Sequence, residues 1–417
     1  MDDPVLLIAD DLSGAAEAAA AFHMRAPRII ELQPSQTVRE PITDDVVVVD
    51  TDSRYTEPDL AAERCRAALA HARPGGTVLK KIDSALRGPL AAELAALREP
   101  GELLIATPAL PALGRTVLGG EVRINGVPLR HSAAWAAETR TGPATVAEAL
   151  APLPVSEVAL SVVRGGADQL MAALRAAAAA DRVAICDAET DTDLDRLVAA
   201  GIAVGAAGVP VRWAGAAGLA YALARAYPGD PHRTNARPNW SATGPILFVV
   251  GTAAPAARAQ LTRLAEQVEI VVELGPDLLA RAADPAERNT LAAEVTERTA
   301  GRTAVVQLAE AAGAPRSPNL VEAMARAVAQ TARTHPTLLL TGGETARAVL
   351  TAIEIDELVV REAWQDGVVL STAPDGRAVL TRPGAFGDPD ALARIARQFR
   401  AVAGSPDQPQ PHEEEPQ

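Results

Sequence analysis

Short apolar runs that each end in a polar cluster most restrict the fold of this chain. Residues 5–9 are apolar throughout and lead into Asp10 and Asp11, and residues 46–49 lead into the cluster Asp-Thr-Asp-Ser-Arg at 50–54. Strands that are apolar at every position are typical of parallel sheets covered by helices on both faces. Ligands of such sheets bind at the carboxyl ends of the strands. The pattern therefore predicts an α/β protein with a small-ligand site where these clusters meet.

The next apolar run, residues 78–82, carries the only two lysines of the 417-residue chain, Lys80 and Lys81. An ammonium group is a compact charge with rotatable donors, suited to a developing negative charge such as a phosphoryl oxygen. An exposed pair left over from a bias toward arginine is the alternative. The run predicts a short strand that ends at Asp83 and Ser84, so these side chains are expected at the same edge of the sheet.

A fourth run, residues 103–106, precedes a segment punctuated by glycine and proline, residues 108–130, which carries Gly114 and Arg115. We expect this segment to be a functional loop, because a long loop inside a compact domain seldom lacks a role. Strand and helix patterns alternate to residue 227 and resume at residue 245. The chain is therefore expected to hold two doubly wound α/β domains.

Composition sets the predicted boundaries. Residues 1–227 form the first domain and residues 245–403 the second. Between them, residues 228–244 are rich in proline and glycine without periodicity, which is typical of a linker. Residues 404–417 are polar, acidic and proline-rich, and are expected to be disordered.

Composition also excludes several classes of function. A net charge of -14 and an aromatic content of 3% provide neither a basic stripe nor stacking rings for a nucleic acid. The cysteines, Cys65 and Cys186, lie far apart and the six histidines form no ligand pattern, so neither a disulfide framework nor a set of metal-binding residues is indicated. The N-terminus does not resemble a signal peptide, and no apolar run is long enough to span a membrane. We expect a soluble cytoplasmic protein, with a homodimer as the common assembly of such proteins.

The residues alone leave two interpretations of the first clusters open. Asp10 and Asp11 suit a general base and a ligand for magnesium or a hydroxyl group, but they equally suit helix N-caps. Arg54 suits a bidentate grip on a carboxylate, with a surface ion pair as the alternative. Residues 341–345, Thr-Gly-Gly-Glu-Thr, stand between a strand and a helix, where free amides point at a ligand. They are not a Walker A sequence.

Taken in order, these clusters resemble the four-carbon acid sugar kinase family over nearly the whole chain. The matching segments are residues 9–15 (ADDLSGA), 50–54 (DTDSR), 80–88 (KKIDSALRG), 108–129, 215–219 (GAAGL), 342–346 (GGETA) and 384–387 (GAFG). The resemblance implies an N-terminal domain that binds a tetronate-type sugar acid and a C-terminal domain that binds ATP. It also implies transfer of the γ-phosphoryl group to a hydroxyl of the acid across an interdomain active-site cleft.

The resemblance further implies the residues of the site. The sugar acid would meet Asp10, Asp11, Arg54, Lys80, Lys81, Asp83, Ser84, Arg87, Gly114 and Arg115. Asp11, Lys81 and Asp83 among them would be catalytic, with Asp11 preferred over Asp83 as the base that accepts the proton of the attacking hydroxyl. The nucleotide, ATP with Mg²⁺, would meet Gly251, Thr252, Gly342, Gly343, Glu344, Thr345, Gly384 and Ala385.

The last glycine turn departs from the common family pattern. Members often have Lys-Ser-Gly-Gly-Phe-Gly, where this chain has Arg-Pro-Gly-Ala-Phe-Gly at residues 382–387. Pro383 removes an amide donor, and Ala385 adds a methyl group near the nucleotide. A catalytically weak regulatory protein that binds the sugar acid and the nucleotide is therefore the alternative function. A NAD-linked dehydrogenase is excluded, because no GxGxxG follows the first strand. The identity of the acid, whether erythronate, threonate or an oxo form, stays open.

Overall fold

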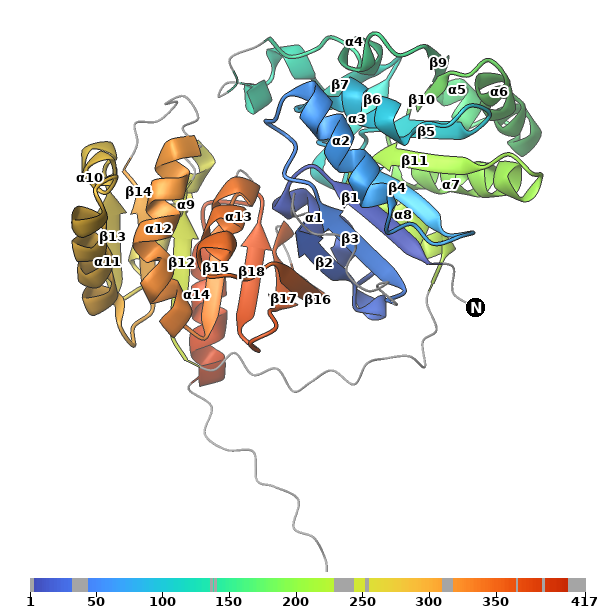
Figure 1. Ribbon diagram of the computed structural model, residues 1–417. Helices are drawn as coiled ribbons and strands as arrows, with labels where there is room; N and C mark the ends of the chain where they lie inside the picture. The colour runs from blue at the N-terminus through green and yellow to red at the C-terminus, as the bar shows by residue number, and fades with distance from the viewer. Residues whose placement is uncertain are drawn as a thin grey trace, which may run out of the picture.

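The chain folds into two α/β lobes (Figure 1). The computed structural model describes residues 4–31, 44–135, 138, 141–228, 244–251, 255–309, 318–364, 367–384 and 387–403. The predicted linker lies outside these ranges apart from its end residues 228 and 244, and the predicted tail, residues 404–417, lies wholly outside them. No helix in the described part of the chain is long and apolar enough to cross a membrane.

The N-terminal lobe is built on eight parallel strands, whose pairing follows from their continuous apolar character. In spatial order the strands are β2 (Arg28–Glu31), β3 (Val46–Asp50), β1 (Val5–Ala9), β4 (Thr77–Lys81), β11 (Val211–Gly215), β5 (Leu103–Thr107), β10 (Val183–Cys186) and β9 (Val155–Val158). All five residues of β1 and of β3 are buried. The carboxyl ends of β1, β3 and β4 are adjacent, so their polar clusters meet as predicted.

Helices cover both faces of this sheet. One layer holds α1 (Leu12–Ala20), α5 (Leu160–Val163), α6 (Ala167–Ala179), α7 (Asp191–Ala206) and α8 (Ala217–Ala226), and the other holds α2 (Pro58–Leu69), α3 (Leu90–Leu97) and α4 (Val146–Leu150). Alanine on the buried faces of α1 and α8 lets these helices approach the sheet closely. The lobe is a doubly wound α/β domain, as predicted.

The C-terminal lobe is a mixed sheet with helices on both faces. Its strands, in spatial order, are β13 (Ile270–Leu274), β14 (Ala304–Leu308), β12 (Ile246–Val250), β15 (Thr337–Thr341), β18 (Ala378–Arg382), β17 (Val369–Thr372) and β16 (Glu357–Ala363). The first five are parallel, and β17 and β16 are antiparallel. Helices α10 (Pro276–Arg281), α11 (Pro285–Thr299), α12 (Pro318–Thr334) and α13 (Gly343–Ala352) form one layer, and α9 (Pro255–Ala265) and α14 (Ala391–Ala403) the other.

One continuous sheet joins the two lobes, which the sequence analysis did not predict. Strand β16 pairs antiparallel with β2, with Leu358 opposite Ile29, so that fifteen strands form a single sheet. Helix α1 of the first lobe also packs against α13 of the second. Figure 1 shows β16 and β17 beside α1 and β2. The relative placement of the lobes therefore rests on a strand ladder as well as on side chains.

The expected loop at residues 108–130 is largely a small antiparallel sheet, which corrects that prediction. It consists of β6 (Arg115–Leu118), β7 (Glu121–Ile124) and β8 (Val127–Pro128). Asn125 and Gly126, at φ 50° and 80°, form the tight turn between β7 and β8. Asn-Gly is a strong hairpin signal because both residues tolerate positive φ. The sequence contained this signal, but the many glycines and prolines around it favoured a loop.

Candidate active site

Arg54 binds both carboxylates that follow β1. Its Nε and Nη2 donate to Asp10 Oδ2 and Oδ1 at 2.7 and 2.9 Å, and its Nη1 and Nη2 donate to Asp11 Oδ2 and Oδ1 at 2.7 and 2.9 Å. The Arg54 side chain is only 10% exposed. The guanidinium thus makes the bidentate carboxylate grip that its fork geometry favours, but the carboxylates are those of the protein. Arg54 organises the acidic pair.

The two carboxylates differ in electrostatics although they are adjacent. Burial opposes the charge of Asp10, but Arg54, Lys80 and Lys81 outweigh it and hold the pKa of Asp10 below its ordinary value. Burial raises the pKa of Asp11, and repulsion from Asp10 adds to the rise beyond what Arg54 and Lys81 offset. Neighbouring carboxylates whose pKa values are pushed apart are typical of acid–base sites. Asp11 is the better proton acceptor of the pair.

Asp11 also caps helix α1, as one of the two interpretations of the acidic pair predicted. Its Oδ1 accepts from the Gly14 amide at 2.8 Å. Oδ1 therefore has two donors, Gly14 and Arg54, whereas Oδ2 accepts from Arg54 Nη1. Because a carboxylate oxygen can accept two hydrogen bonds, Oδ2 has capacity for a substrate hydroxyl.

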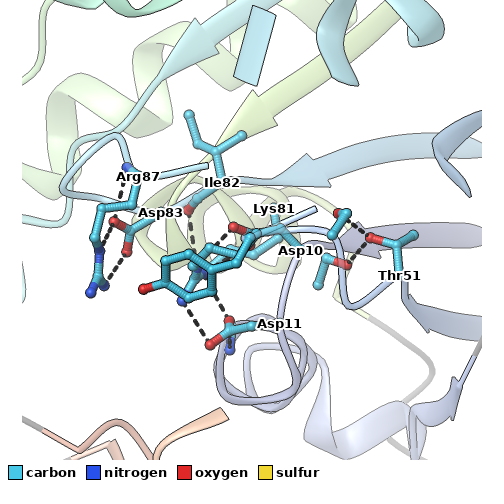
Figure 2. A network of polar contacts seen from close by, with 12 residues as sticks. Asp10, Asp11, Thr51, Lys81, Ile82, Asp83 and Arg87 are labelled. Carbon is cyan, nitrogen blue, oxygen red and sulfur yellow. Dashed lines mark hydrogen bonds and ion pairs between the residues drawn. The ribbon is translucent and has the colours of Figure 1, made fainter. Parts of the chain in front are cut away.

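The two lysines of β4 point to opposite faces of the sheet, as side chains of successive strand residues do. Lys81 Nζ lies 3.5 Å from Glu17 Oε2 on α1 and donates to the Ile82 carbonyl at 3.1 Å. Figure 2 shows Lys81 among Asp10, Asp11 and Asp83 at the strand ends. Lys81 is therefore placed to bring positive charge to the acidic pair.

Lys80 is completely buried on the other face. Its Nζ lies 3.1 Å from Glu93 Oε1 on α3, and both side chains are 0% exposed. Glu93 also accepts from Ser53 Oγ, at 2.5 Å. Burial disfavours the ammonium, but Glu93 outweighs it, so the pKa of Lys80 is raised. Because Lys80 is buried, this geometry favours an indirect role, in which its positive charge helps to lower the pKa of Asp10.

The segment after β4 contributes two further contacts. Asp83 is clamped by Arg87, whose Nε and Nη2 donate to Oδ2 and Oδ1 at 2.7 and 2.9 Å. Burial alone would raise the pKa of Asp83, but Arg87 and Arg54 hold it far below its ordinary value. A carboxylate held so firmly in its charged form is a weak base. Arg115 Nη1 donates to Ser84 Oγ at 2.9 Å, which brings β6 to the same site.

Gly114 serves the same region through its backbone. Its φ is 65°, and a Cβ at this position would lie 2.1 Å from Asn125 Oδ1. The backbone N–H of Asn125 also donates to the Gly114 carbonyl at 2.7 Å. Glycine is needed here for the positive φ and for the close approach. Gly114 therefore shapes the turn that precedes Arg115.

The glycine turn before α13 meets the acidic pair across the domain boundary. Gly342 has a φ of 87°, and a Cβ on Gly343 would lie 2.3 Å from Asp11 Oδ2. Ser13, in the same lobe as Asp11, donates from its Oγ to the Arg382 carbonyl of the other lobe at 3.5 Å. Gly343, the first residue of α13, thus lies next to the carboxylate whose pKa is raised.

Other predicted nucleotide residues converge on this turn. A Cβ on Gly251, which follows β12, would lie 2.2 Å from Thr345 Oγ1. Glu344 is half-buried on the same turn, and Gly384 follows β18. Thr252 and Ala385 lie outside the described residues.

Arg382, which stands where family members often have lysine, is buried inside its own domain. Its Nη1 donates to Gln260 Oε1 at 2.7 Å, and Gln260 Nε2 donates to the Gly387 carbonyl at 3.1 Å. The side chain is 1% exposed. Arg382 therefore braces the last glycine turn from within the domain.

Gly343 offers a direct test of this contact between the domains. Gly343→Ala is expected to lower kcat/KM by roughly 100-fold, because the added methyl group forces Asp11 and the turn apart and small misplacements are costly. Steady-state kinetics provides the measurement. Gly275→Ala in the same domain is the control, since a Cβ there meets nothing within 4 Å. An unimpaired Gly343→Ala variant would mean that the domains work further apart.

Sequence reasoning missed several residues that shape the site. Glu93 and Glu17 hold the two lysines, and Arg347 on α13 pairs with Asp50 at the end of β3. A lone glutamate in an otherwise apolar helix, as in residues 90–97, is a signal that could have identified Glu93. The others depend on tertiary contacts.

Two family models match this chain in succession. The sugar-binding N-terminal domain matches residues 5–223, and the nucleotide-binding C-terminal domain matches residues 247–392. Two solved structures share the fold across both regions. A Salmonella typhimurium LT2 protein with the provisional name tRNA synthase has a TM-score of 0.75 at 21% identity, covering 95% of this chain and 99% of that one. Haemophilus influenzae protein HI1011 has a TM-score of 0.65 at 20% identity, covering 94% and 100%.

Curated relatives align along nearly the whole length. The chain is 36% identical to the D-threonate kinase of Cupriavidus necator, over 93% of this chain and 96% of that protein. It is 32% identical to the D-threonate kinase of Bordetella bronchiseptica, over 94% and 97%. It is 28% identical to the 3-oxo-tetronate kinase of Methylobacterium radiotolerans, over 93% and 97%. With both domains matched and a relative 36% identical over 93% of this chain, the protein belongs to the four-carbon acid sugar kinase family.

Proposed function

We propose that this protein is an ATP-dependent kinase that transfers the γ-phosphoryl group to a hydroxyl of a four-carbon sugar acid, with D-threonate as the first candidate acceptor. The observation that carries the proposal is the contact between Asp11, the carboxylate with the raised pKa, and Gly343 of the nucleotide turn. A proton acceptor and a phosphate-binding turn from different domains are the two parts that phosphoryl transfer to an alcohol requires. The names of the relatives support the substrate class.

The reaction follows from these positions. Asp11 accepts the proton of the attacking hydroxyl as its oxygen forms a bond to the γ-phosphorus, and the bond from that phosphorus to the bridging oxygen of ADP breaks. Lys81 offsets the negative charge that develops on the transferred group. We propose that the sugar acid is oriented by three residues near Asp83, namely Ser84, Arg87 and Arg115. Arg54 and Lys80 keep Asp10 charged and hold the acidic pair in place.

Mg²⁺ would accompany the nucleotide. The described residues hold no group of three or more histidine, cysteine or acidic side chains around one point. Mg²⁺ is usually held by one or two carboxylates together with substrate phosphates. Asp52 and Glu344 would hold it. Asp52 is exposed in the segment after β3, where the negative charges of Asp50 and Glu344 act on it and the positive charges of Arg347 and Arg64 oppose them. When bound, Mg²⁺ would neutralise charge on the phosphates.

The deciding experiment is ADP release with ATP and Mg²⁺ against a panel of four-carbon sugar acids. The panel holds D-threonate, D-erythronate, their epimers and the oxo acids, with ATP alone as the blank. One acid is expected to raise release well above the blank, which identifies the acceptor. No stimulation by any acid, with ATP binding still detectable by calorimetry, would instead support the catalytically weak regulatory protein. Gel filtration of the same preparation tests the predicted homodimer.

A further inference from the structure

A buried cluster of three charged residues crosses the domain boundary next to the site. Arg347, one turn after Gly343 on α13, donates from Nε to Asp50 Oδ2 at 3.0 Å, and its Nη2 contacts the same oxygen. Its Nη1 lies 3.0 Å from Glu31 Oε2. Asp50 and Glu31 are the last residues of β3 and β2 in the other domain. One guanidinium of the nucleotide domain therefore holds two strand ends of the sugar-acid domain.

This cluster is shielded from water. The side chains of Asp50, Arg347 and Glu31 are 0%, 9% and 18% exposed. Burial works against the charge of Arg347, but Asp50 and Glu31 outweigh it and raise its pKa. Buried ion pairs contribute little net stability because desolvation offsets their attraction, and their better-attested use is to fix one register between packed elements. Here the register is that of one domain against the other.

The position of the cluster determines what it can fix. The ladder between β16 and β2 joins the domains along one line, with Leu358 opposite Ile29. Helix α1 also packs against α13, and Ser13 Oγ donates to the Arg382 carbonyl, at 3.5 Å. Arg347 adds a buried ionic attachment at the carboxyl ends of the strands, the edge where Asp11 lies. This attachment is the one that joins α13, which begins at Gly343, to the strand ends of the other domain.

We infer that Arg347 is a positioning residue that couples the sugar-acid site to the nucleotide site. This rests on the proposed function and goes beyond it. The ion-paired arrangement is the one in which the glycine turn meets Asp11, so a nucleotide bound at the turn favours it. The same arrangement completes the sugar-acid site. Each ligand therefore tightens the binding of the other, as linkage requires.

Calorimetry on the full chain tests the coupling. D-threonate is titrated into wild type and Arg347→Met, with and without the non-hydrolysable ATP analogue AMP-PNP. In wild type the analogue is expected to tighten D-threonate binding at least about fivefold. In Arg347→Met that factor should fall to about one, while each ligand alone binds within about threefold of wild type. A purely structural role would weaken both single affinities together, and that result would overturn the inference.

Variants that separate charge from folding accompany this test. Arg361→Met is the matched control, because Arg361 is in the same domain and donates to Thr372 of its own domain, at 3.1 Å. It should keep the full coupling factor. Asp50→Asn should reduce coupling as Arg347→Met does, and the double variant should lose no more than either single one, since they remove the same interaction. Arg347→Lys should restore part of the coupling, which gives a readout if Arg347→Met folds poorly.

Hydrogen exchange provides a readout that needs no sugar acid. In wild type, AMP-PNP is expected to slow exchange of the Gly14 backbone amide. This amide donates to Asp11, and both residues are in the N-terminal domain rather than in the nucleotide-binding one. In Arg347→Met the slowing should be confined to the nucleotide domain. Equal slowing in both proteins would refute the coupling role, whether or not D-threonate is the acceptor. If wild type binds AMP-PNP but no acid of the panel, the proposed function fails while the exchange result still decides the inference.

Discussion

Asp11→Asn should lower kcat by roughly 100- to 10,000-fold, the range that a general base contributes, with the KM for the sugar acid changed only slightly. Asparagine has the same shape, and its side-chain oxygen can still accept from Gly14 and cap α1. It cannot accept the proton of the hydroxyl. If Asp11 only capped α1 and paired with Arg54, the substitution would weaken the pair with Arg54 but would not lower kcat by this much. Steady-state kinetics that reports kcat and KM separately distinguishes the two roles.

The pH dependence adds a second measurement for the same variant. A base must be unprotonated, so kcat falls as the pH drops through its pKa. The raised pKa of Asp11 places that fall at a higher pH than an ordinary aspartate would. Asp11→Asn should remove this acidic limb of the profile. Asp284→Asn is the control, because Asp284 caps α11 by accepting from the Ala286 amide at 2.8 Å, far from the site.

Asp83 is the competing candidate, and the same assay compares the two. Arg87 and Arg54 hold the pKa of Asp83 so low that it has little affinity for a proton. Asp83→Asn is therefore expected to raise KM for the sugar acid, through the loss of its clamp on Arg87, more than it lowers kcat. A larger loss of kcat in Asp83→Asn than in Asp11→Asn would reverse the assignment.

The fold was predictable where the pattern was continuous. The sequence predicted the strands β1, β3, β4 and β5. In the structure β3, β1 and β4 are adjacent, and β5 is separated from β4 by β11. The join between the lobes was not predictable. Strand β2 is only four residues long, and its partner β16 lies more than 300 residues away in the sequence, mixed with charged residues. Pairing of such strands is decided by tertiary context, which local periodicity does not record.

The meeting of the polar clusters that follow β1, β3 and β4 was predictable, but the contacts within it were not. Alternation along a strand predicts that Lys80 and Lys81 face opposite sides, yet it cannot say which side holds the site. The acidic residue that each lysine pairs with shows which face it is on. Lys80 pairs with Glu93 on α3, and Lys81 lies near Glu17 on α1. Arg54 was expected to bind a substrate carboxylate, but the carboxylates of Asp10 and Asp11 occupy its donors. The role of each charged side chain depends on the charged groups that lie near it in the folded protein. The spacing of residues in the sequence does not determine which groups these are.

Lys80→Met should destabilise the sugar-acid domain by about 3–5 kcal/mol, the cost of leaving a buried carboxylate without its partner. Glu93 would be that carboxylate, since it is fully buried and its Oε1 lies 3.1 Å from Lys80 Nζ. The methionine fills similar volume, so the effect reports the charge rather than a cavity. Urea unfolding followed by tryptophan fluorescence measures it, because Trp213 is buried in this domain.

Two further variants show that burial causes the effect. Arg326→Met removes an ion pair with Glu322 in which both side chains are more than half exposed, at 56% and 58%, and it should cost less than about 1 kcal/mol. Replacing both members of the buried pair, as Lys80→Met with Glu93→Gln, should restore part of the stability lost in Lys80→Met, because no unpaired charge is left inside. If the double variant were less stable than Lys80→Met by the full cost of Glu93→Gln alone, the two residues would act independently. The lysine would then be held by packing rather than by its pair with Glu93.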